Sequence, residues 1–117
     1  MRTSTLCKTI LGTVFAFTAL AVPGLASAVD EQAAKALWRR NDCNKCHAKS
    51  RDKKGPSLKK IAKELNAKSD AEQKVLDNMT NAPKVKLLDS GKEEEHKVID
   101  TKDEAEKKNL AAWILSH

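Results

Sequence analysis

Two thiols and an imidazole lie within five consecutive residues, Cys43-Asn44-Lys45-Cys46-His47. This is the C-x-x-C-H pattern by which a haem is attached covalently to a polypeptide, as haem c. One short turn presents both thiols to the two vinyl groups of a single macrocycle, and the adjacent imidazole of His47 can then bind the iron. The pattern therefore predicts one covalent haem c, held by Cys43, Cys46 and His47.

A bare C-x-x-C pair also occurs in disulfides, in redox-active dithiols and in zinc sites. A zinc site needs two further ligands at suitable spacing, and the only histidines outside the motif are His96 and His117. A thioredoxin-like dithiol needs a βαβ setting, and no stretch of the chain alternates convincingly with the period of a strand. The histidine directly after the second cysteine favours haem attachment over these alternatives.

Residues 1–28 are predicted to be a secretory signal peptide that is cleaved after Ala28. They combine a positively charged start, an apolar run over residues 10–22 and the A-x-A segment Ala26-Ser27-Ala28. The apolar run is too short for a membrane anchor, which needs about 20 residues. The prediction places the mature protein in the periplasm, and haem c is assembled outside the bacterial cytoplasm, which agrees with export.

The remaining segment, residues 29–117, is predicted to be one domain with a small apolar core. Its only aromatic residues are Trp38 and Trp113, because both phenylalanines lie in the signal peptide and the chain has no tyrosine. A domain this short buries little apolar surface of its own. A haem would supply much of the missing core, so we expect the haem-free chain to be largely unfolded.

Apolar residues in this segment recur at helical spacing, which predicts an all-α domain of about four helices wrapped around the haem. Asp30 can cap a first helix that continues through Asn41 and ends at the haem motif. Capping boxes at residues 69–72 and 101–104 open two later helices. Residues 80–100, which contain a proline, a glycine and an acidic cluster, are predicted to be mostly loop.

The chain has 22 basic and 16 acidic residues, which gives a net charge of +6. Nine of the basic residues lie between positions 45 and 68, against only Asp52 and Glu64. This stretch could form a basic collar around a haem edge that attracts acidic redox partners, or it could be an ordinary solvated lysine surface. Nucleic-acid binding is disfavoured, because the stretch lacks interleaved aromatic residues and the compartment is wrong.

Together with the haem motif, two further segments resemble those of the class I c-type cytochromes, which include small bacterial monohaem proteins. Residues 55–58, with the sequence G-P-S-L, are a turn before a helix and are similar to the G-P-x-L segment of that family. Residues 110–114 belong to a last helix with an aromatic residue near its end. The resemblance implies a class I cytochrome c-like fold, in which the first and last helices cross with Trp38 and Trp113 at the crossing.

The chain departs from this family at the second iron ligand. Class I cytochromes usually supply a methionine from the loop before the last helix, and this loop contains none. Counting back from Trp113, the position of that methionine falls on or next to His96, which we therefore expect to bind the iron opposite His47. Two alternatives remain open. One is ligation by Met79, which shares an apolar helix face with Val75, and the other is an empty or weakly held sixth position.

The resemblance also implies that the backbone carbonyl of Pro56 accepts a hydrogen bond from His47 and so fixes its tautomer. Two strong axial ligands leave the iron no open position, so a bis-histidine haem exchanges single electrons without readily binding oxygen or peroxide. We predict a monomeric periplasmic electron carrier, not an enzyme, whose partners are acidic-surfaced cytochromes or membrane oxidoreductases of a respiratory chain. Some proteins of this kind are associated with iron oxidation. The alternatives are a small-gas sensor or weak peroxidase, and an electron-transfer subunit of a larger oxidoreductase.

Overall fold

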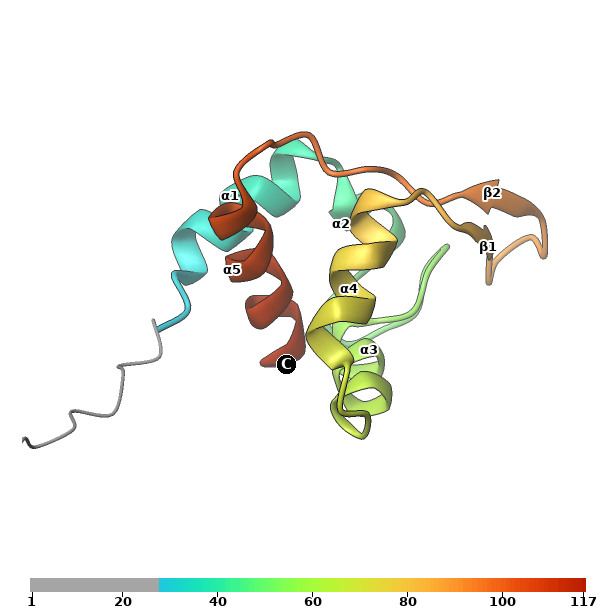
Figure 1. Ribbon diagram of the computed structural model, residues 1–117. Coiled ribbons are helices and arrows are strands. Elements are labelled where there is room, and N and C mark those ends of the chain that lie inside the picture. The colour runs from blue at the N-terminus through green and yellow to red at the C-terminus, as the bar shows by residue number, and fades with distance from the viewer. Residues whose placement is uncertain (1–27) are drawn as a thin grey trace, which may run out of the picture.

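The computed structural model describes residues 28–117, so the predicted signal peptide lies outside the described residues apart from Ala28. Within this range no helix is both long enough and apolar enough to cross a membrane. The elements follow in the order α1 (Glu31–Arg40), α2 (Cys43–Cys46), α3 (Leu58–Asn66), α4 (Ala71–Thr80), β1 (Lys84–Lys86), β2 (Glu93–Glu95) and α5 (Glu104–Leu115) (Figure 1).

The first and last long helices, α1 and α5, pack against each other, and α5 also contacts α3 and α4 (Figure 1). At the contact of α1 with α5, the rings of Trp38 and Trp113 meet edge to face, with centroids 5.7 Å apart and planes inclined by 67°. This is a favoured geometry for aromatic pairs. Both side chains are buried. The prediction that these two residues pack where the first and last helices cross is confirmed.

The buried core is a single cluster to which the four longer helices and the segment before α5 contribute. The apolar residues that recur at helical spacing point into it, as the sequence predicts. Its members are Ala34, Leu37, Trp38, Leu58, Val75, Met79, Ile99, Leu110, Ala111, Trp113 and Ile114.

Two helices begin slightly later than the predicted capping boxes. The N-cap of α4 is Asp70, whose carboxylate makes no capping hydrogen bond and instead lies 3.3 Å from Lys74. The N-cap of α5 is Asp103, whose carboxylate accepts hydrogen bonds from the backbone N–H groups of Ala105 and Glu106. The capping-box pattern predicted both helices correctly, but in each case the N-cap residue is an aspartate that lies nearer the helix than the predicted Ser69 or Thr101.

Residues 80–100 are not simply a loop, because they contain the antiparallel pair β1–β2, which projects away from the helices (Figure 1). Lys84 lies opposite Glu95 and Lys86 opposite Glu93, so opposite charges face each other across the two strands. Each strand has only three residues: β1 is Lys-Val-Lys and β2 is Glu-Glu-Glu, so the pair contains a single apolar residue, Val85. A search for apolar alternation therefore missed the pair.

Candidate functional site

The C-x-x-C-H motif forms the one-turn helix α2 and the residue after it. The chain enters this turn through Asp42, whose left-handed backbone (φ 57°, ψ 21°) turns the chain between α1 and α2. Cys43 and Cys46 are partly buried, and no disulfide joins them. The backbone N–H of His47 donates to the carbonyl of Cys43 at 3.0 Å. One hydrogen-bonded turn therefore carries both thiols and the imidazole.

The surroundings of the motif do not favour its alternative uses. Burial raises the pKa of the Cys43 thiol to about 11. Redox-active and catalytic cysteines instead have a lowered pKa, because the thiolate is their reactive form. Among residues 28–117, no three His, Cys, Asp or Glu side chains gather into a group that could hold a metal ion, as a zinc site would require. Covalent attachment of a haem is the use that fits.

The imidazole of His47 is held on one side by the turn before α3. Its Nδ1 lies 2.6 Å from the carbonyl oxygen of Pro56. A carbonyl can only accept a hydrogen bond, so Nδ1 carries the proton, and Nε2 keeps the lone pair that a metal would need. Burial lowers the pKa of His47, which favours this neutral form.

Gly55 leaves the space that this ring occupies. A Cβ atom at position 55 would lie 2.5 Å from Cε1, 2.9 Å from Nδ1 and 3.1 Å from Nε2 of His47. The backbone N–H of Gly55 also donates to the carbonyl of Cys46 at 2.9 Å. The glycine of the G-P-S-L segment therefore allows the turn to approach the histidine closely, a role that the sequence reading did not assign.

The turn around Pro56 is fixed by a carboxylate that the sequence reading did not single out. Asp52 accepts a hydrogen bond from the backbone N–H of Ser57 at 2.8 Å, and it lies 3.4 Å from Lys60. The hydrogen bond from Ser57 is the main reason why the pKa of Asp52 falls below its usual value. The Ser57 hydroxyl in turn caps α3 by accepting from the N–H of Lys60.

The structure brings His96 to His47, although 48 residues separate them in the chain. Their ring centroids are 6.2 Å apart, and the ring planes are inclined by 42°. The Nδ1 of His96 lies 3.0 Å from the carbonyl oxygen of Lys97, so each ring has its Nδ1 on a backbone carbonyl. A metal bound by one nitrogen of each of two imidazoles holds the centroids roughly 6 Å apart, since such bonds are about 2.0 Å long. The separation of the two rings is compatible with both of them binding one metal ion.

The structure places the other candidate ligand, Met79, in the apolar core. Its side chain is 4% exposed and belongs to the same cluster as Val75 and Ile99. The remaining histidine, His117, packs on Trp113 with ring centroids 4.7 Å apart, and its Nδ1 lies 2.9 Å from the Trp113 carbonyl. Met79 therefore contributes to core packing, and His117 covers the C-terminal end of α5.

Most of the nine basic residues between positions 45 and 68, the candidates for a basic collar, form no ion pair with the residues that the structure describes. Lys45 and Lys60 lie near Asp42 and Asp52 respectively, at 3.2 and 3.4 Å. In the part of the chain that the structure describes, the others form no ion pair with an acidic side chain, so the stretch around the motif remains positively charged. These residues are Lys49, Arg51, Lys53, Lys54, Lys59, Lys63 and Lys68.

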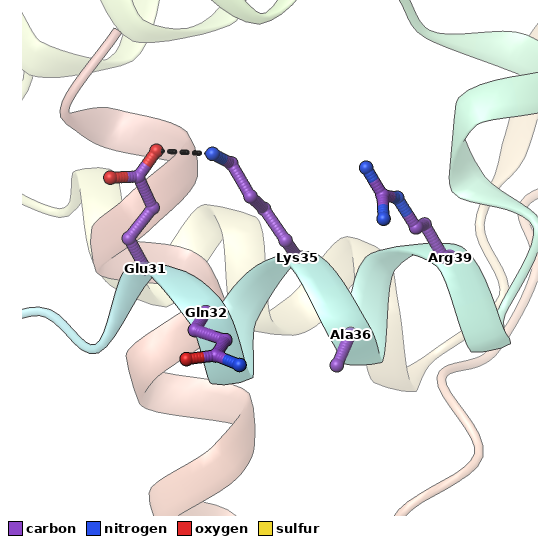
Figure 2. Close-up of a pocket in the computed structure, with 5 residues that line it drawn as sticks. All are labelled: Glu31, Gln32, Lys35, Ala36 and Arg39. Carbon is purple, nitrogen blue, oxygen red and sulfur yellow. Dashed lines mark ion pairs between the residues drawn. The ribbon is translucent and has the colours of Figure 1, made fainter.

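A shallow hollow on the outer face of α1 is unrelated to this site. Figure 2 shows the five side chains that line it, and all of them are exposed. Glu31 and Lys35, one helical turn apart, form an ion pair of 2.6 Å across it. No residue of the haem motif contributes, and the remaining lining residues are Gln32, Ala36 and Arg39.

Comparison with known proteins found similarity to a family model and to solved structures. The family model described as cytochrome c matches residues 31–117. A crystal structure described as the class 1 cytochrome MtoD from Sideroxydans lithotrophicus ES-1 is 49% identical in sequence. Its match covers 76% of this chain and 97% of that chain, with a TM-score of 0.71. A comparison with curated proteins found no match.

Proposed function

The chain belongs to the cytochrome c family, and on that premise we propose that it is a periplasmic one-electron carrier with a single haem c. The resemblance to class I cytochromes and the corresponding helical fold, both predicted from the sequence, are confirmed by these matches. Membership of the family implies a covalently bound haem c and redox partner proteins. The number of haems, the iron ligands, the partners and the location are part of the proposal.

In the proposed site, Cys43 and Cys46 hold the macrocycle and His47 and His96 bind the iron. The observation that carries this assignment is the 6.2 Å separation of the two imidazole rings, both with Nδ1 on a backbone carbonyl. Carbonyl partners of this kind orient a ligating ring and raise its basicity. The buried position of Met79 supports His96 over the methionine.

The haem, when bound, supplies an iron that changes its charge by one electron. The chain's own residues determine what else can happen there. Two imidazoles on the iron leave no position for oxygen or peroxide, so we propose electron transfer without bond chemistry. A second imidazole in place of a thioether also lowers the reduction potential, because methionine ligation raises it. Pro56 and Lys97 keep the two rings in position through their carbonyl groups.

The positive charge around the motif determines which partners the protein would meet fastest. A surface with mostly unpaired lysines attracts a negatively charged partner, and its effect on the association rate falls as salt is added. We therefore propose that the partners are acidic-surfaced cytochromes or membrane oxidoreductases of a respiratory chain, iron-oxidation chains included. We propose that the carrier itself works as a monomer.

Spectroscopy of the ferric holoprotein tests the ligand assignment. The wild-type protein should lack the charge-transfer band that a methionine sulfur gives with ferric haem, and the His96→Met variant should gain it. The control is Met79→Leu, which should leave the wild-type spectrum unchanged. A sulfur band in the wild type that disappears in Met79→Leu would refute the assignment.

Carbon monoxide separates the carrier from the alternative of a gas sensor or peroxidase. The reduced wild-type protein should bind it slowly, because His96 must leave the iron first. Removal of that ligand in His96→Ala should make binding fast. A fast and complete spectral change in the wild type would instead indicate a sixth position that is open to ligands.

A further inference from the structure

The segment that carries His96 is connected to the end of α1 through one buried side chain, Asn41, which is 1% exposed. Its Nδ2 donates to the carbonyl of Leu37 at 3.0 Å. Its Oδ1 accepts a hydrogen bond from the backbone N–H of Asp100 at 2.7 Å, across 59 residues of sequence. A buried amide is stable only with such partners, and removal of one leaves the other unsatisfied.

Other contacts hold the segment from 96 to 101 on its opposite side. The N–H of His96 donates to the Pro83 carbonyl at 2.8 Å, and that of Ile99 donates to the Met79 carbonyl at 2.9 Å. These bonds attach the segment to α4 and to the residue just before β1. They do not fix its distance from the haem motif, which lies at the end of α1.

Towards the haem motif, the described residues offer only two direct polar links from this segment. One is the bond from Asp100 to Asn41, and the other is an ion pair of 3.8 Å between Lys97 and Asp42. Both partners of the ion pair are about half exposed, so solvent and salt screen it and it contributes little. The bond to Asn41 is the shorter of the two, and it is made by a buried side chain.

We propose that Asn41 is a positioning residue that keeps His96 against the iron. Asn41 lies two residues before Cys43, and Asp100 lies four residues after His96. The bond between them therefore fixes the distance between the haem attachment and the second ligand. This inference rests on the proposed function, because it assumes that His96 binds the iron. Asn41 does not bind the iron itself, but it would help to keep His96 bound there.

Loss of this bond has a measurable consequence. With Asn41→Leu the amide N–H of Asp100 loses its partner, and the screened ion pair between Lys97 and Asp42 is the only polar link towards the haem motif that remains among the described residues. His96 should then leave the iron more often, and carbon monoxide binds only to the fraction of molecules in which it has left. For the loss of a hydrogen bond at a buried side chain, we expect binding to become about tenfold faster.

The chain offers a matched control in Asn109. Its side-chain amide also makes two hydrogen bonds. Its Oδ1 accepts from the backbone N–H of Asp30, and its Nδ2 donates to the Asp30 carbonyl, each at 2.8 Å. This pair connects α5 to the start of α1, away from the segment that carries His96. Asn109→Leu therefore removes a long-range link of two hydrogen bonds, at a more exposed site, and leaves the bond of Asn41 intact.

The experiment measures carbon monoxide binding to the reduced holoproteins, well below their unfolding temperatures, with His96→Ala as the fully open reference. Amide hydrogen exchange at Asp100 is measured in parallel. Wild type and Asn109→Leu should bind slowly and agree within about twofold. Asn41→Leu should bind about tenfold faster and exchange the Asp100 amide faster. If Asn41→Leu does not fold, Asn41→Ser removes the same acceptor more mildly and should shift both readouts in the same direction.

Three results would overturn the inference. Binding as slow as wild type in Asn41→Leu and Asn41→Ser would refute the role of Asn41 and leave His96 as the ligand. Equal acceleration in Asn109→Leu would show that general loss of stability opens the iron. Wild-type binding as fast as in His96→Ala would refute ligation by His96 itself, and the role of Asn41 with it.

Discussion

Replacement of Gly55 by alanine tests how closely the turn before α3 holds His47. The added Cβ would lie 2.5 Å from Cε1 of the imidazole and 2.9 Å from its Nδ1. Carbon atoms that are not bonded prefer a separation of about 3.5–4.0 Å, so the ring or the turn must move by about 1 Å. Such a shift lengthens or bends the 2.6 Å contact between Nδ1 and the carbonyl of Pro56.

Both consequences of this movement can be given a size. Overpacking of a well-packed site costs about 1–3 kcal/mol, and loss of a hydrogen bond costs about 0.5–1.5 kcal/mol. We therefore expect Gly55→Ala to lower the free energy of unfolding of the holoprotein by about 1.5–4.5 kcal/mol. The reduction potential should also rise, because a ligand without its carbonyl partner is less basic and stabilises ferric iron less.

Urea denaturation of the ferric holoprotein, followed by circular dichroism and by the haem absorption band, measures the first effect. The control is Gly91→Ala. Gly91 has a left-handed backbone (φ 69°) and open space around it, since the nearest atom to an added Cβ is Cε of Lys86 at 3.7 Å. That substitution should lower the free energy of unfolding by about 1–2 kcal/mol, because alanine is strained in a left-handed backbone. It should leave the reduction potential unchanged.

A small effect would refute this reasoning. If Gly55→Ala lowers the free energy of unfolding by less than about 0.5 kcal/mol and keeps the wild-type reduction potential, the turn does not hold the imidazole of His47. A shift of the potential in Gly91→Ala equal to that in Gly55→Ala would show that the change is not specific to the contact with His47.

Three further predictions follow from other contacts. A double-mutant cycle of Trp38→Leu and Trp113→Leu should give a coupling of about 0.5–1.5 kcal/mol, from the edge-to-face ring pair. Asp52 should stabilise the protein at neutral pH and cease to do so as pH falls through its lowered pKa, so Asp52→Asn should flatten the acid limb of a plot of stability against pH. Lys49→Glu should slow reduction of ferricyanide, a small anion, by about threefold at low salt, with the difference fading as salt is added.

Each of these predictions has a contradicting outcome. A coupling near zero would mean that the two tryptophan rings do not stabilise each other. An acid limb as steep in Asp52→Asn as in wild type would assign the acid sensitivity to other carboxylates. The control for the charge reversal is Lys108→Glu, on α5 outside the collar. An equal slowing there would show that net charge matters and that the collar does not.

The haem motif, the helices and the signal peptide were predicted from patterns that span only a few residues. The C-x-x-C-H spacing and helical periodicity depend on neighbours within one or two turns, so the sequence alone specifies them. The same applies to the helix starts, which the predictions missed by one residue at α4 and by two at α5. At α5 the reason is that the carboxylate of Asp103 makes the capping hydrogen bonds. The short β1–β2 pair was missed, because its strands have three residues each and together contain only one apolar residue, Val85, which is too few for a recognisable period.

The sequence by itself determined the attachment chemistry, the helices and two candidates for the second iron ligand, His96 and Met79. Only the tertiary structure decided that His96 lies 6.2 Å from His47, while Met79 is in the core. It also decided that Gly55 makes room for the ring and that Asn41 reaches Asp100. Such contacts join residues far apart in the chain. They depend on how whole helices pack, which no local pattern of residues records.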